Sequence, residues 1–174
     1  MSSRQLLKTL QKLQLTSPYT RSSINMLSKD NVYTVLKLEL RKRKMRIEKS
    51  LSDSLHAMSS ETKSSAGDKH ETGRAMAQLE QEKLSGQLAT ATQLTGIITG
   101  IDPAAKHYHV QFGSLVQLDA NWYFFSVGVG AIMVQEIKVF CLSAATPLGK
   151  ILLKKKLGDS IAFNGKDMSI RSHT

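Results

Sequence analysis

Three carboxylates surround a short stretch of small polar residues, and their spacing is suited to contacting a metal ion through oxygen. Glu61 precedes the stretch Ser64-Ser65-Ala66-Gly67, and Asp68 and Glu71 follow it. Residues three apart on a helix lie on the same face, so Asp68 and Glu71 would present their carboxylates together. We take Asp68 and Glu71 as the candidate metal-assisting pair, with Glu61 beside them.

The same acids also have a structural interpretation. Asp68 is a good N-cap residue, and an acid in the first turn of a helix, such as Glu71, interacts favourably with the helix dipole. His70, between them, could carry a proton, although an exposed histidine among polar residues is more often inert. The sequence leaves both interpretations open.

A cationic run lies far from these acids, along the segment that leads to them. Residues 41–46 read Arg-Lys-Arg-Lys-Met-Arg, and Lys-Lys-Lys occupies 154–156. Such runs can face a nucleic acid or an acidic protein, or simply form a solvated face. The candidates for contact with a polyanion or an acidic protein surface are Arg41, Lys42, Arg43, Lys44 and Arg46.

The charge balance favours a partner that is, or handles, a polyanion. The 174 residues carry 24 Lys and Arg against 14 Asp and Glu, a net charge of +10. Segment 61–100 has more acids (five) than bases (four), whereas the segments on either side are basic. A basic protein is steered toward polyanions over long distances, although high charge also serves solubility alone.

Composition excludes or disfavours several classes of protein. Cys141 is the only cysteine, so the chain forms neither an intrachain disulfide nor a cysteine-based zinc cluster. It lies in an apolar run typical of a core strand, which disfavours a free-standing enzyme with a cysteine nucleophile. The sequence has no apolar run of about 18 residues and no secretory signal. We therefore expect a cytoplasmic protein without a membrane segment.

Residues 1–29 contain five Lys and Arg and no acid, and they are only weakly amphipathic. A transit peptide, a basic arm that touches nucleic acid, or sequence added by an upstream start site would each fit this composition. We expect a disordered basic extension or added sequence, with Met26 and Met45 as internal starts.

Two long helices must position the acids. From Asp30, a candidate N-cap, apolar residues recur at spacings of three, four and seven, and a second such stripe ends before Gly100 and Pro103. Residues 30–102 are thus predicted to form an antiparallel helical hairpin, or coiled coil, about 40 Å long with its tip near 60–70. The stripes consist of Tyr33, Leu36, Leu40, Ile47, Leu51, Leu55 and Met58, and of Met76, Leu79, Leu84, Leu88, Ala91, Leu94 and Ile98.

After Pro103 the pattern changes to short strands, so we predict a small antiparallel sheet over 103–174. Asn164-Gly165 is a strong hairpin-turn signal, because both residues tolerate positive φ. Pro147 would begin a short helix. The fold class is α+β. The expected strands are 115–118, 122–127, 137–142, 160–163 and 168–170.

Two blocks of sequence, in a hairpin followed by a small α+β domain, carry a resemblance to a known family. The first is residues 61–76, around the acids. The second runs from Thr146-Pro147-Leu148-Gly149-Lys150 to Lys156-Leu157-Gly158-Asp159. With these blocks the chain resembles the bacterial Gre-type transcript-cleavage and elongation factors (the GreA/GreB family), whose C-terminal signature is similar to the second block. The resemblance is to a compact branch known from Bacteroidetes-type bacteria in particular.

The resemblance implies a partner and a mechanism. An FKBP-like C-terminal domain would dock on RNA polymerase, and the hairpin would enter the secondary channel. There the tip acids would help the polymerase hold a second Mg²⁺ for cleavage of backtracked RNA, so the chain would be no enzyme, would hold no cofactor of its own and would act as a monomer. The basic residues at 41–46 would face nucleic acid or polymerase. The partner-binding residues implied are Pro147, Leu148, Gly149, Lys150, Gly158 and Asp159.

At the tip, the chain departs from the family. Gre factors carry an Asp and a Glu three apart before an Asn-Ala-Glu-Tyr stretch, whereas this chain has Asp68 and Glu71 in a Gly/Ser-rich setting. A channel-binding regulator without cleavage activity therefore remains an alternative.

Overall fold

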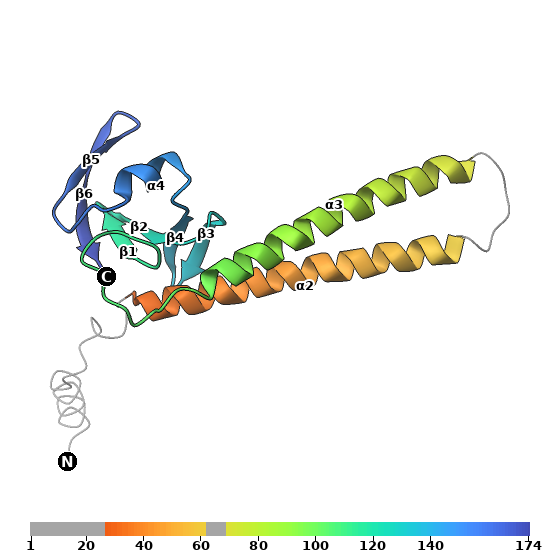
Figure 1. The fold of residues 1–174 in the computed structure, drawn as a ribbon, viewed down its shortest axis with the longest axis horizontal. Helices are drawn as coiled ribbons and strands as arrows, with labels where there is room; N and C mark the ends of the chain where they lie inside the picture. The colour runs from red at the N-terminus through yellow and green to blue at the C-terminus, as the bar shows by residue number, and fades with distance from the viewer. Residues whose placement is uncertain (1–26, 62–68) are drawn as a thin grey trace, which may run out of the picture.

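The structure is a computed structural model that describes residues 27–61 and 69–174, with the side chains of 27–57 and 72–174. Two long helices, α2 (Lys29–Glu61) and α3 (Lys69–Ile98), run side by side away from a small sheet domain (Figure 1). At about 1.5 Å per residue, α2 is about 50 Å long and α3 about 45 Å. The sheet domain contains one short helix, α4 (Pro147–Leu152). The fold is α+β.

The sheet has six strands in the order β3-β4-β2-β1-β6-β5. The prediction of an antiparallel sheet needs one correction, because β2 and β4 pair in parallel while the other neighbours pair antiparallel. The strands are β1 (Leu115–Leu118), β2 (Asn121–Phe125), β3 (Gly130–Val134), β4 (Ile137–Leu142), β5 (Ser160–Phe163) and β6 (Lys166–His173).

The parallel pair follows from β3, a strand that the sequence did not predict. After β2 the chain crosses to the edge of the sheet and forms β3. It then turns back as β4, which lies between β3 and β2. Gln135 and Glu136 make the β3–β4 turn with φ of 49° and 67°, although neither is a typical residue for positive φ. The residues of β3, Gly-Ala-Ile-Met-Val, show no alternation of polar and apolar types. Neither the turn nor the strand was therefore visible in the sequence.

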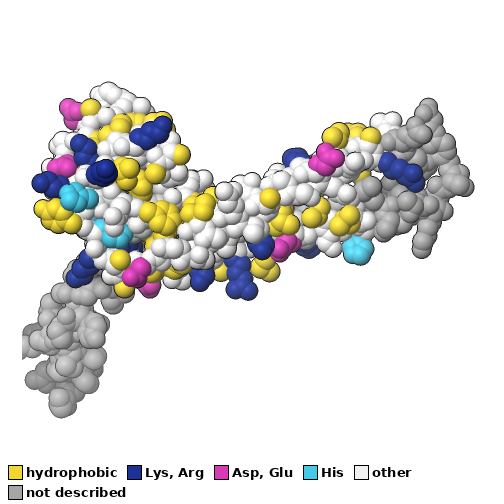
Figure 2. Space-filling view, viewed as in Figure 1, with side chains coloured by type: hydrophobic (Ala, Val, Ile, Leu, Met, Phe, Trp, Pro, Cys, Tyr) yellow, Lys and Arg dark blue, Asp and Glu magenta, His cyan; other side chains and the backbone are white. Residues whose placement is uncertain are grey.

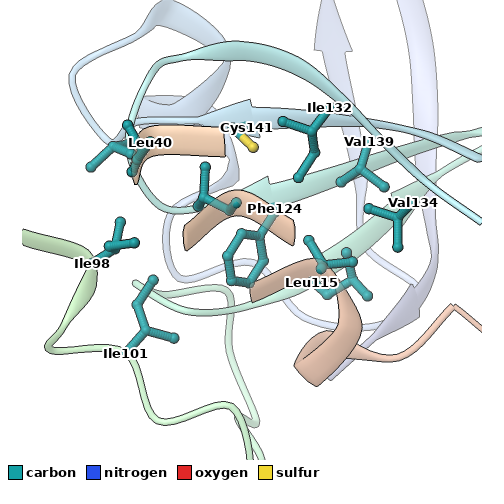
Figure 3. Packing of buried hydrophobic residues seen from close by; sticks show 12 residues of the cluster. Leu40, Ile98, Ile101, Leu115, Phe124, Ile132, Val134, Val139 and Cys141 are labelled. Carbon is teal, nitrogen blue, oxygen red and sulfur yellow. The ribbon is translucent and has the colours of Figure 1, made fainter. Parts of the chain in front are cut away.

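Strand alternation fills two cores on opposite faces of the sheet. Phe124 belongs to the core beneath the hairpin, and Phe125 belongs to the core beneath α4, as expected when successive side chains point to opposite faces. Figure 3 shows Phe124 among Leu40 of α2, Ile98 of α3 and residues of the sheet. The hairpin base, the sheet and α4 thus form three layers.

Helix α2 begins one residue inside the predicted extension. Ser28 is its N-cap, because its Oγ accepts a hydrogen bond from the Asn31 amide at 3.1 Å. The prediction of Asp30 as N-cap was therefore wrong, and Lys29 belongs to the helix and is buried. At the other end, α3 stops at Ile98, before Gly100, as predicted.

Other local predictions are confirmed. Asn164 and Gly165 have φ of 52° and 72° and join β5 to β6. The short helix begins at Pro147. No helix in the described ranges has the length and apolar character needed to cross a membrane.

Candidate functional site

Two of the three predicted acids, Glu61 and Glu71, lie at the end of the hairpin farthest from the sheet. Helix α2 ends at Glu61 and α3 begins at Lys69. Asp68 lies outside the described residues, and the side chains of Glu61 and Glu71 are not among those described. Their role stays a prediction. Within 27–57 and 72–174, no group of three His, Cys, Asp or Glu side chains is placed to hold a metal ion.

The apolar stripe of the hairpin is buried near the sheet and exposed toward the tip. Leu36 and Leu40 are almost completely buried, and Ile47, Leu84 and Ala91 form a second buried cluster between the arms. Farther out, Leu55, Met76 and Leu79 are 52%, 69% and 64% exposed. The distal arms therefore have apolar side chains that no other described residue covers.

The basic run winds around α2 close to the sheet domain. Figure 2 shows Lys and Arg side chains along the hairpin edge formed by the first half of α2. Along the helix, Arg46 is about 22 Å from Glu61. Cations and tip acids are thus well separated.

The members of the run face different surroundings. Arg43 and Arg46 line a groove of about 390 Å³ between α2 and β3. Lys42 pairs with Glu39 at 3.0 Å, and Lys44 pairs with Glu48 at 3.7 Å. Arg41 is exposed. The five predicted cations therefore do not form one continuous face.

The Thr146-Pro147-Leu148-Gly149 motif has a clear structural role. The Thr146 hydroxyl caps α4 by accepting a hydrogen bond from the Gly149 amide at 3.1 Å. A Cβ on Gly149 would lie 2.1 Å from the Ser143 carbonyl oxygen, so only glycine fits. Leu148 packs into the core beneath α4.

Burial narrows the predicted partner-binding set on α4. Leu148 and Gly149 are buried, so they offer no exposed side chain, and their assignment to partner binding stays a prediction. Pro147 and Lys150 are exposed on the same helix. These two residues remain available for contact.

The Lys156-Leu157-Gly158-Asp159 segment is a tight turn. The Asp159 carboxylate accepts a hydrogen bond from the Lys156 amide at 3.0 Å, and Gly158 has a φ of +87°, which favours glycine. Leu157, between them, is 60% exposed. Asp159 thus holds the turn, and Leu157 and Gly158 form its outer surface.

Sequence reasoning missed a polar cluster where the hairpin meets the sheet. The Ser114 hydroxyl lies 2.8 Å from His107 Nδ1 and 3.2 Å from His173 Nε2, and the buried Lys29 ammonium donates to the Ala105 carbonyl. Lys29 lies in α2, Ala105 and His107 lie in the linker after α3, Ser114 directly precedes β1, and His173 ends β6. No short-range pattern connects them.

The cluster shifts the titration of its members. Burial lowers the pKa of Lys29, and the Asp102 carboxylate opposes this change. Burial also lowers the pKa of His107 and of His173, and the Lys29 charge acts in the same direction on both rings. The folded state therefore favours neutral imidazoles here.

Cys141 has the properties of a core residue. It is 6% exposed on β4, within the core beneath the hairpin. Burial raises the pKa of its thiol to about 12. Because the thiolate is the reactive form, this cysteine is a poor nucleophile, in agreement with the sequence-based interpretation.

Comparisons with known proteins give one structural match. No protein-family model matches the chain, and neither does any curated protein. A solved structure, that of the transcription factor Gfh1, matches with a TM-score of 0.32 and 16% sequence identity, over 78% of this chain and 93% of that one. At this score and identity, the match does not assign the chain to a family.

Proposed function

We propose that this protein is a Gre-like transcription factor that binds RNA polymerase and inserts its hairpin into the secondary channel. The observation that carries the proposal is a pair of helices about 45 to 50 Å long that is anchored to the sheet domain at one end. Such a projection can reach a site inside a larger assembly while the sheet domain stays outside.

The anchoring gives the projection a fixed direction. Val32, Leu36 and Leu40 of α2 and Ile98 of α3 share one core with Phe124 of the sheet. Since closely packed cores resist small displacements, the hairpin base cannot swivel without breaking these contacts. A partner that binds the sheet domain would thereby receive the hairpin in a defined orientation.

Docking would use the exposed residues of the C-terminal signature. Pro147 and Lys150 on α4 are exposed, and Leu157 is exposed on the turn that follows. An exposed apolar side chain near a cation suits a protein surface with an apolar centre and an acidic rim. The buried members of the signature, Leu148 and Gly149, would position this surface.

The tip acids would assist RNA cleavage by the polymerase. Glu61, Asp68 and Glu71 offer hard carboxylate oxygens, a donor set that fits Mg²⁺. A second metal ion in the polymerase would stabilise charge during phosphodiester cleavage. The protein itself would be neither an enzyme nor a holder of a resident cofactor. The basic run at 41–46 would lie beside nucleic acid or polymerase.

Transcript shortening tests the proposal. Core bacterial RNA polymerase is stalled in a backtracked complex with labelled RNA, and the full-length protein is added. The protein is expected to accelerate RNA shortening. Asp68→Ala/Glu71→Ala should lose this effect but still co-purify with polymerase. The control, Glu80→Ala/Glu82→Ala, removes two exposed acids of α3 farther from the tip and should behave as wild type.

Two outcomes would change the conclusion. Binding without shortening by the wild-type protein would favour a channel-binding regulator that lacks cleavage activity. Failure to co-purify with core polymerase at moderate salt would remove the proposal altogether.

A further inference from the structure

Strand β3 forms one edge of the sheet, and part of its backbone is free to pair. No strand of the described chain pairs with its outer side. Val134 and Ile137 flank the two-residue turn, so they form a hydrogen-bonded pair. Pairs alternate along an antiparallel ladder. Ile132 therefore also points its peptide groups at β4, whereas Ala131 and Met133 point theirs outward.

This edge has no charge, no proline and no bulge, three of the features that commonly prevent strand addition. Natural sheets protect their edges with charges, prolines, bulges or a covering element. The five residues of β3 include no charge and no proline, and its register with β4 is continuous. Met133 is 57% exposed.

A groove lies between β3 and α2. Its volume is about 390 Å³. On the strand side it is lined by Ala131 and Met133, the two residues whose peptide groups point outward, and also by Val129 and Ile132. On the helix side it is lined by Glu39, Leu40, Arg43 and Arg46. A chain segment laid along β3 would thus face a row of α2 side chains.

The helix side of the groove is cationic. Glu39 is engaged by Lys42 at 3.0 Å. Within the described chain, neither Arg43 nor Arg46 has an ion pair, and Arg46 Nε donates only to the Lys42 carbonyl. Two arginines without acidic partners beside an open strand edge favour an occupant with carboxylates.

We propose that this groove binds an extended, acidic segment of a partner protein, which adds to the sheet as a strand beside β3. Its backbone pairs with Ala131 and Met133, its carboxylates contact Arg43 and Arg46, and its apolar side chains cover Met133. An extended peptide suits the edge better than a nucleic acid does, since the edge offers alternating amide donors and carbonyl acceptors. This surface is separate from α4 and the hairpin tip, and it shares Arg43 and Arg46 with the cationic run at 41–46. The test below uses no polymerase, so its outcome is independent of the proposed function.

The test uses the full-length protein and synthetic peptides followed by fluorescence anisotropy. The probe is a labelled peptide of about seven residues with alternating glutamate and valine, long enough to span the five residues of β3. One matched peptide has lysine in place of glutamate, and another has backbone N-methyl groups on the edge that would face β3. We expect the glutamate–valine probe to bind and the two matched peptides not to bind. Binding of the probe should be weaker at moderate salt than at low salt.

Variants assign the site. Met133→Pro removes an outward N–H without breaking the β3–β4 ladder, and Arg43→Glu/Arg46→Glu reverses the charge. Each should weaken probe binding at least about tenfold. Arg41→Glu, an exposed cation of the same run outside the groove, is the matched control and should weaken it much less. Circular dichroism melts confirm that each variant is folded.

Several results would overturn the inference. Equal binding of the N-methylated peptide would exclude strand addition. Equal loss in the Arg41→Glu control would indicate non-specific charge attraction. If the acidic peptide does not bind, while oligouridylate binds and loses this binding in Arg43→Glu/Arg46→Glu, the surface recognises RNA. If wild type dimerises and Met133→Pro does not, the occupant is a second copy of this chain.

Discussion

The two ends of the hairpin use the same kind of residue in opposite ways. Near the sheet, Leu36 and Leu40 are buried against Phe124. Toward the tip, Leu55 and Leu79 continue the same stripe but face solvent. The difference indicates that the base stabilises the fold, whereas the distal arms leave apolar side chains exposed and add little to stability.

Substitutions at the base and in the distal arms should therefore affect different properties, namely stability and binding. A change at the base should act on the free energy of unfolding, because it opens a packed core. A change in the distal arms should leave folding nearly unaffected and act on binding.

The largest effect is expected from shortening a buried leucine. Leu40→Ala should lower the free energy of unfolding by about 2 to 5 kcal/mol, because it leaves a cavity in the shared core. The same change at the exposed Leu79 should cost within about 0.5 kcal/mol. Urea denaturation measures both. Similar losses at the two positions would show that the distal arms are packed as tightly as the base.

Two glycine-to-alanine substitutions should change the free energy of unfolding in opposite directions. Gly149→Ala drives a Cβ against the Ser143 carbonyl and should destabilise the protein by about 1 to 3 kcal/mol. Gly86→Ala, in α3, meets no atom within 4 Å and should stabilise it by about 0.5 to 1 kcal/mol through helix propensity. Thermal unfolding measures both. A stable Gly149→Ala variant would contradict the close approach of α4 to Ser143.

The polar cluster at the base should make stability depend on pH. The pKa values of His107 and His173 are lowered in the folded state, chiefly by burial. Below the unfolded value of about 6.5, the unfolded chain therefore binds more protons. Stability should be complete above that pH, decline as pH falls below it, and level off below the folded pKa values.

Denaturation at a series of pH values tests this dependence. His107→Gln/His173→Gln should flatten the decline, whereas His109→Gln, at an exposed position in the same linker, should retain it. If the stability of the double variant declines with falling pH as steeply as that of wild type, the polar cluster is not the source of the pH dependence.

The smallest effects are expected from ion pairs on the helix surface. Glu39→Gln removes the pair with Lys42 on α2, and Glu80→Gln removes the pair with Lys83 on α3. Each should change the free energy of unfolding by less than about 0.5 kcal/mol, because both pairs are exposed. Chemical denaturation at low and high salt measures this. A loss above 1 kcal/mol at either position would mean that charge, and not apolar burial, sets local stability there.

Local chemistry made much of the fold predictable. The Asn164-Gly165 turn and the Pro147 helix start rest on residues whose backbone preferences dominate their short segments. The two long helices were visible because their stripes repeat over many turns. Neighbours in sequence sufficed for each of these predictions.

Features that depend on distant partners escaped prediction. Strand β3 is apolar on both faces, and its turn residues, Gln135 and Glu136, take positive φ without the usual residue types. The contact between Ser114 and His173 joins residues 59 positions apart in the sequence. The groove beside Arg43 exists only because β3 is an edge strand.

A crosslinking experiment tests the central claim most directly. A photoreactive residue replaces Met76, which is exposed on the distal arm, or Lys83, which is exposed nearer the base, and each protein is irradiated with core RNA polymerase. We predict that position 76 crosslinks to peptides lining the secondary channel near the active site, and that position 83 crosslinks nearer the channel entrance. Crosslinks from position 76 to the outer surface of polymerase alone, or none from either position, would contradict hairpin insertion.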